Sequence, residues 1–171
     1  MTSSASGRAD HTLEAGFDTR DERLARVAWS RLAEPGDTAA QELVAAEGAV
    51  AALAQVLGDR GPRRWQARRP DLDPVRDLST LHRLGGRLLI PGDAEWPSSL
   101  SALGAEAPFC LWARGPLNLA ASTVQAAAVV GARAATPYGE RVAGELADGC
   151  ATRGITVVSG AALVLYPVSC C

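Results

Sequence analysis

One stretch of the chain, residues 124–158, has the residue pattern of a strand, a glycine-containing turn, a helix and a second strand. The apolar run Val124 to Val130 predicts the first strand, a helical pattern runs from about Pro137 to Thr152, and Ile155 to Val158 predicts the second strand. Two strands joined through a helix pair in parallel, because the helix carries the chain back to the edge where it started. The stretch therefore predicts a βαβ unit of an α/β fold.

The turn between the first strand and the helix holds the residues with the clearest chemical meaning. In an open parallel sheet, ligands bind beyond the carboxyl ends of the strands, where a helix N-terminus offers unpaired amides and a partial positive charge. Gly131 permits close backbone approach, and Arg133 offers a charge-assisted contact to a phosphate oxygen. Thr136 is the expected N-cap of the helix, which would leave the amides of Tyr138 and Gly139 directed into the turn.

Spacing alone leaves two interpretations of this turn open. Either Gly131 and Arg133 hold one phosphate of a backbone or nucleotide, or the glycine only permits a tight turn and the arginine pairs with a surface carboxylate. Tyr138 likewise stacks on a base or packs over the helix start. The turn lacks both the G-x-G-x-x-G fingerprint and the phosphate loop G-x-x-x-x-G-K-[ST], so no cofactor is expected.

The residues that precede the βαβ unit predict a small helical domain. Residues 1–20 have the composition of a disordered leader, and residues 21–57 contain three short helical patterns separated by Glu34-Pro35-Gly36-Asp37 and by Gly48. Asp37 or Thr38 is expected to cap the second helix. Residues 58–80 are rich in Gly, Pro and charged side chains without sustained periodicity, which predicts a mainly irregular linker.

Arginines at positions 60, 63, 64, 68 and 69 surround Trp65 in this linker. They form a phosphate patch with a stacking ring, or they are solvated while Trp65 packs onto a neighbouring domain. Beyond residue 80, the sequence predicts a strand at 87–90 that ends in the turn 91–93, a helix start at 96–100 and a strand at 109–113.

Composition narrows the function. The formal net charge of −2 argues against a protein that wraps duplex DNA through bulk electrostatics, so any nucleic-acid contact is local. The four cysteines, at 110, 150, 170 and 171, lack the spacing of a zinc site, so no metal is expected. No signal peptide and no apolar run of about 18 to 20 residues is found, which predicts a cytoplasmic protein without a membrane span.

Four segments occur in an order and spacing that resemble the DprA (Smf) family of DNA-processing proteins: PGDAEWPSSLSAL, a strand ending in ARG, VVGARAATPYG and GITVVSGAA. The resemblance covers residues 85–162, and residues 21–57 resemble the small helical (SAM-like) domain of many members. It implies an α/β fold in which residues 81–162 form part of a Rossmann-like parallel sheet. The site residues that it implies lie on a phosphate-binding turn (Gly131, Arg133), at the helix entry (Thr136, Tyr138, Gly139) and on a second turn facing the same pocket (Ser159, Gly160).

The resemblance also implies a function. Members of this family bind and protect single-stranded DNA and help load the RecA recombinase during natural transformation, without a catalytic step, and a homodimer is implied as well. After Ala162 the sequence departs from the family, because LVLYPVSCC stands where Gly-Ile-Asp is expected. Residues 163–171 are therefore interpreted as a divergent tail, and the sheet and dimer surface are expected to be incomplete, with marginal stability.

Two other functions stay open at this point. Related Rossmann-like folds bind or hydrolyse nucleotides, although no paired Glu and Arg motif follows the VVSG segment and His82 is expected to be a surface residue of a helix. Alternatively, the chain is a vestigial product whose helical domain survives as an interaction module.

Overall fold

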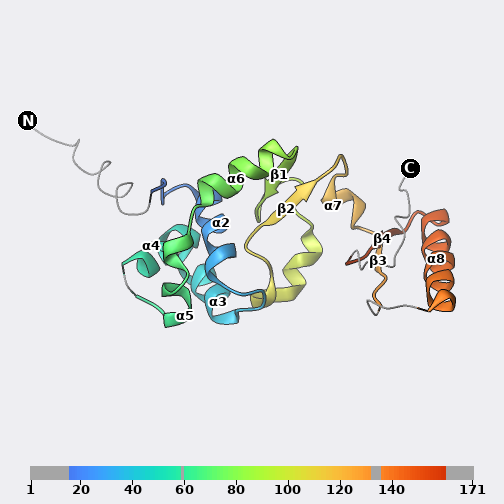
Figure 1. Ribbon diagram of the computed structural model, residues 1–171, viewed down its shortest axis with the longest axis horizontal. Coiled ribbons are helices and arrows are strands. Elements are labelled where there is room, and N and C mark those ends of the chain that lie inside the picture. The colour runs from blue at the N-terminus through green and yellow to red at the C-terminus, as the bar shows by residue number, and fades with distance from the viewer. Residues whose placement is uncertain (1–15, 59, 132–135, 161–171) are drawn as a thin grey trace, which may run out of the picture. The chain divides into compact units, whose positions relative to one another are not determined.

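The computed structural model describes residues 16–58, 60–131 and 136–160 (Figure 1). By compactness the chain divides into two units, residues 1–116 and 117–171, which we call the larger and the smaller unit. The finer domain boundaries expected at residues 57, 80 and 162 stay predictions. The segment interpreted as a divergent tail, residues 163–171, lies outside the described residues.

The larger unit begins with the three expected helices, α2 (Glu22–Leu32), α3 (Thr38–Glu47) and α4 (Ala49–Leu57). Asp37 is the N-cap of α3, because its carboxylate accepts a hydrogen bond from the amide of Ala40 at 3.3 Å. Gly48 joins α3 to α4 with a φ of 84°, a conformation that residues with a Cβ rarely adopt. The N-cap residue and the glycine between the helices explain why the three helices could be predicted from the sequence.

Aromatic rings from distant parts of the chain fill the core of this unit. Trp29 is fully buried, and its indole N–H donates to the carbonyl oxygen of Ala49 at 3.0 Å. Its ring meets Trp65 edge-on, with 5.3 Å between ring centroids, and stacks on Phe109 with 5.7 Å between centroids. Phe17 is buried in the same core, so ordered packing begins inside the stretch that was interpreted as a leader.

The segment expected to be a mainly irregular linker is largely helical, so that interpretation of its structure was wrong. It contains α5 (Arg63–Gln66), the 3₁₀ turn η1 (Arg69–Asp71) and the ten-residue helix α6 (Pro74–Arg83). Asp73 caps α6 by accepting the amide of Arg76 at 2.9 Å, and Pro74 occupies the first helical position. Leu78 and Leu81 then pack α6 against a small cluster around buried Leu88.

Two strands complete the larger unit. β1 (Gly86–Leu89) pairs antiparallel with β2 (Leu111–Arg114), and the connection between them contains the 3₁₀ segment η2 (Ser98–Glu106). The strands lie within a residue or two of the expected positions, whereas the expected helix after residue 96 is a 3₁₀ segment broken at Gly104. This ribbon packs against the helices, since Leu88 and Cys110 share a cluster with Val27 of α2.

The smaller unit has the predicted βαβ topology. After the short helix α7 (Leu119–Ser122), strand β3 (Ala126–Ala128) is followed by α8 (Pro137–Thr152) and by β4 (Thr156–Val158), which pairs in parallel with β3. Figure 1 shows α8 alongside the two strands. The α/β class with a partial Rossmann-like sheet is thereby confirmed, and α8 has the predicted bounds.

Among the described residues, no single helix is long and apolar enough to cross a bilayer. The helices α3 and α4, bent by 116° relative to each other, reach the necessary length and apolar composition only when they are taken together.

Candidate functional site

The carboxyl ends of β3 and β4 lie at one edge of the smaller unit. The parallel register pairs Ala128 with Val158, and the amide of Val129 donates to the carbonyl oxygen of Val158 at 2.9 Å. Gly131 follows β3 shortly after this point, and Ser159 and Gly160 follow β4 directly. Because parallel strands end at the same edge, the two predicted turns leave the sheet side by side. All three of these residues are exposed.

The N-terminus of α8 supplies the third part of this edge. Thr136 is the N-cap, as predicted, and its hydroxyl oxygen accepts the amide of Gly139 at 3.2 Å. The expectation that the Gly139 amide is free was therefore wrong, because the cap itself uses it. In the part of the chain that the structure describes, the amide of Tyr138 has no acceptor and keeps its place at the positive end of the helix dipole.

The ring of Tyr138 is 68% exposed rather than packed over the helix start. The guanidinium of Arg141 lies 5.6 Å from its centroid, within the range of a cation–π contact. The ring thus presents a face to solvent beside a cation. Arg133 lies outside the described residues, so its predicted phosphate contact stays a prediction.

Trp65 and Arg64, within the cluster of arginines, have structural roles. Trp65 is buried, and its indole N–H donates to the carboxylate of Asp37 at 2.9 Å, so the interpretation of a stacking ring was wrong and the packed alternative holds. Arg64 donates to both carboxylate oxygens of Asp37, at 3.0 and 2.9 Å. These bonds from Arg64, helped by Trp65 and the Ala40 amide, outweigh burial and lower the pKa of Asp37 to about 2.

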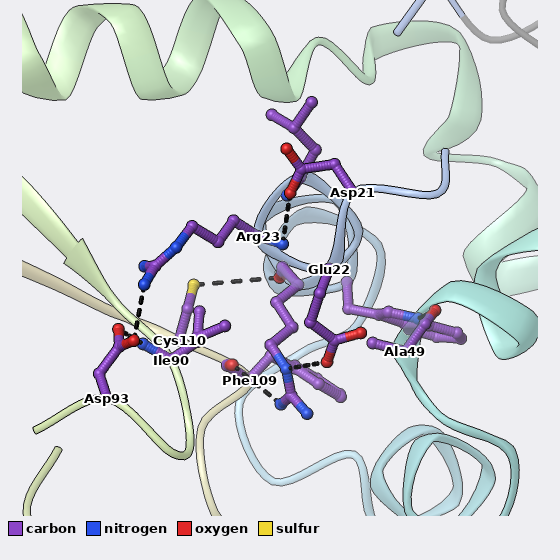
Figure 2. A network of polar contacts seen from close by, with 11 residues as sticks. Asp21, Glu22, Arg23, Ala49, Ile90, Asp93, Phe109 and Cys110 are labelled. Atoms are coloured by element: carbon purple, nitrogen blue, oxygen red, sulfur yellow. Dashed lines mark hydrogen bonds and ion pairs between the residues drawn. The ribbon is translucent and has the colours of Figure 1, made fainter. Parts of the chain in front are cut away.

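The PGD segment is a fold-determining turn. Asp93 accepts the amide of Ile90 at 2.9 Å through one carboxylate oxygen and the guanidinium of Arg23 at 2.6 Å through the other (Figure 2). Arg23 also donates to the carbonyl oxygen of Leu88 at 3.2 Å, which ties α2 to the end of β1. Burial alone would raise the pKa of Asp93, but the bonds from Ile90 and Arg23 prevail and lower it.

Sequence interpretation gave no role to Trp112 on β2, whose side chain is 41% exposed. The segment LWAR contains a signal that could have identified Trp112 as a candidate binding residue. It places an aromatic residue and an arginine two positions apart in one predicted strand, and so on the same face of that strand. His82 lies on the surface of α6, as expected. Within the described ranges, no three His, Cys, Asp or Glu side chains gather as a metal site would require.

The fold and this edge of the sheet define a class of protein: a Rossmann-like α/β protein with exposed residues after both parallel strands and a helix N-terminus at the same edge. Residues 87–164 match the family described as DNA recombination-mediator protein A. Over 147 residues the chain is 44% identical to proteins named as DNA processing protein DprA in two strains of Mycobacterium tuberculosis, CDC 1551 and H37Rv. The chain thus belongs to the DprA family, and the resemblance that its motifs carry is confirmed.

The match to these relatives is partial in length. It covers 78% of this chain but 38% of each relative, so the chain spans less than two fifths of their length. No solved structure shows a significant match.

Proposed function

We propose that this chain takes part in DNA processing during recombination by binding single-stranded DNA at the edge formed by the two turns and the N-terminus of α8. The observation that carries the proposal is the convergence of the ends of β3 and β4 with the entry of α8 in a family named for DNA processing. A phosphate oxygen is the group that such an edge favours, because the Tyr138 amide and the positive end of the α8 dipole both lie there.

The edge is open to a polymer as well as to a small ligand. A Cβ built on Gly131 or Gly160 would meet no atom of the described residues within 4 Å, so the backbone there is open on that side. Tyr138 offers a ring face at the same edge, and a base unstacked from its neighbours can lie on such a ring. Duplex bases are already stacked and paired, so the proposed ligand is a single strand.

The partners and compartment of this function are part of the same proposal. Loading of the RecA recombinase, protection of the strand, homodimer formation and a cytoplasmic location are proposed because the motifs resemble those of the DprA family; the relatives' names extend only to DNA processing. No catalytic step is proposed. The chain has a net charge of −2, which favours a local contact with a few phosphates over an extended basic surface that contacts many of them.

Fluorescence anisotropy with labelled single-stranded and duplex oligonucleotides across a range of salt concentrations tests the proposal. We expect the wild type to prefer the single strand, and Arg133→Ala to weaken binding roughly 5- to 10-fold with a smaller salt dependence. Arg153→Ala is the matched control, because Arg153 follows the opposite end of α8 and its guanidinium donates to the carbonyl oxygen of Gly149. A folded wild type that does not bind the single strand would refute the proposal.

A further inference from the structure

The β1–β2 ribbon of the larger unit carries an exposed aromatic ring and a cation on one face. Trp112 and Arg114 are two residues apart on β2, so their side chains leave the same face of the strand. Their partners on β1 are Leu88 and Gly86. Trp29 and Trp65 are buried and Trp96 is half-buried, whereas Trp112 is the tryptophan that the described part of the chain leaves most exposed.

The end of α6 borders the same face of the ribbon. A Cβ built on Gly86 would lie 2.3 Å from a terminal carbon of Leu81, so α6 packs on the face from which the Arg114 side chain leaves. The helix ends at Arg83, and Gly85, whose amide donates to the carbonyl oxygen of His82 at 2.9 Å, turns the chain into β1. This turn leaves Leu84 57% exposed next to the ribbon.

The guanidinium groups near this face are not neutralised by carboxylates in the described part of the chain. Within the described residues, the guanidinium of Arg114 makes no hydrogen bond or ion pair, and the guanidinium of Arg83 donates once, to the hydroxyl of Thr80 at 2.9 Å. Two acidic side chains of the adjoining elements are already paired with other arginines: Glu95 with Arg87 at 2.6 Å, and Asp77 with Arg31 at 3.0 Å. An anion would therefore meet unneutralised guanidinium groups here.

We propose that Arg83, Leu84, Trp112 and Arg114, which we call the ribbon surface, form a second contact for single-stranded DNA. Trp112 stacks on one base, Leu84 offers an apolar contact to a neighbouring base, and the two arginines contact flanking phosphates. A ring beside cations on an antiparallel ribbon fits an unpaired base with its charged backbone better than it fits a duplex. The ribbon surface shares the ligand of the proposed function but none of its residues.

The test uses the full chain, with fluorescein-labelled oligo(dT) of twenty nucleotides and a hairpin duplex as probes, at about 0.15 M salt, where charges more than about 8 Å apart are screened. We expect Trp112→Ala to weaken binding to oligo(dT) roughly 5- to 150-fold, the range measured for loss of one stacked base. Trp112→Phe should retain affinity within about threefold, because phenylalanine keeps a stacking ring. Far-UV circular dichroism checks that each variant is folded.

Two further readouts separate stacking from a structural role. Oligo(dT) should quench the intrinsic tryptophan fluorescence of the wild type, and this quenching should disappear in Trp112→Phe although binding persists. Arg114→Ala should reduce the slope of log K against log salt by about 0.7, the value for one phosphate contact on a single strand. Arg76→Ala, an exposed arginine at the other end of α6, is the control and should leave both readouts unchanged.

The outcomes distinguish this inference from the proposed function. Equal binding by wild type, Trp112→Ala and Arg114→Ala would overturn the ribbon surface, as would an equal loss in Arg76→Ala. If Arg133→Ala weakens binding while the ribbon variants do not, the proposed function stands without the second contact. If the ribbon variants weaken binding while Arg133→Ala does not, the ribbon surface stands and the turn at the α8 entry loses its role.

Discussion

The two compact units use similar local signals but differ in how much apolar surface they bury. The larger unit packs Trp29, Trp65 and Phe109 into one continuous core. In the smaller unit, Ala147 is the one side chain that is buried among the described residues, whereas Val124 and Val130 are more than 80% exposed. Because apolar burial is the main favourable contribution to folding, most of the stability of the chain must reside in the larger unit.

This difference separates stability from the proposed chemistry. The smaller unit carries the two turns and the helix entry on a two-stranded sheet, and such a sheet is marginal without further packing. Binding edges commonly lie in the less stable parts of a protein, because they must stay open to a ligand. The marginal stability expected from the sequence thus applies to the smaller unit, and a cooperative thermal transition that includes its residues would contradict it.

Replacement of Trp29 should have the largest effect. Trp29→Ala removes a fully buried ring, its contacts with Trp65 and Phe109 and its hydrogen bond to Ala49, and we expect a loss of about 3–5 kcal/mol in the free energy of unfolding. Ala147→Gly, the matched change in the smaller unit, should cost about 1 kcal/mol. Urea unfolding followed by circular dichroism measures both, and equal costs would show that the two units are packed alike.

The Asp37 carboxylate should give the next largest effect. Asp37→Ala removes the N-cap of α3 and leaves the buried indole N–H of Trp65 without its acceptor, which should cost about 2–3 kcal/mol at pH 7. Asp21→Ala is the control, because Asp21 caps α2 through exposed bonds and should cost about 1 kcal/mol.

The contribution of Asp37 to the free energy of unfolding should depend on pH. The folded-state pKa of Asp37 is lowered to about 2 from 3.8, so the unfolded chain binds the proton more readily. The stabilisation is fully present above pH 4 and is lost as the pH falls from 4 through about 2. It amounts to about 1–2 kcal/mol after allowance for solvent around half-exposed Arg64. Urea unfolding at several pH values should show the wild type and Asp37→Ala approaching each other below pH 4; a constant difference would contradict the assignment.

The sequence predicted those parts of the fold that depend on local signals. Thr136 before Pro137 predicted the start of α8, and the two apolar runs around that helix predicted the parallel strands. The same type of signal, Asp73 before Pro74, was present at the start of α6 but was outweighed by the surrounding Gly, Pro and charged residues. Capping residues and apolar periodicity are therefore sufficient to predict the helices and strands when the same weight is given to them along the whole chain.

Long-range packing could not be predicted in this way. Trp65 fills the helical core because Trp29 and Asp37, some thirty residues earlier in the chain, supply a ring and a carboxylate for it. Nothing in the spacing of the surrounding arginines distinguishes that arrangement from an exposed stacking site. The pairing of Arg23 with Asp93 is another contact between distant segments, and it gives the PGD turn a structural role that the motif alone does not reveal.

Loss of the N-cap of α8, at the proposed site, should have the smallest effect on stability. Thr136 caps α8 with the same kind of bond that Asp37 makes at α3, but Thr136 is exposed and has no buried partner among the described residues. Thr136→Ala should therefore cost about 1 kcal/mol, felt as local opening of the smaller unit, with roughly fivefold faster amide exchange in the first turn of α8 and little change in the larger unit. Thr136→Ser keeps the hydroxyl and should exchange like the wild type. Slower folding or lower stability of the larger unit in Thr136→Ala would mean that the two units unfold together, and the separation of stability from the proposed binding edge would fail.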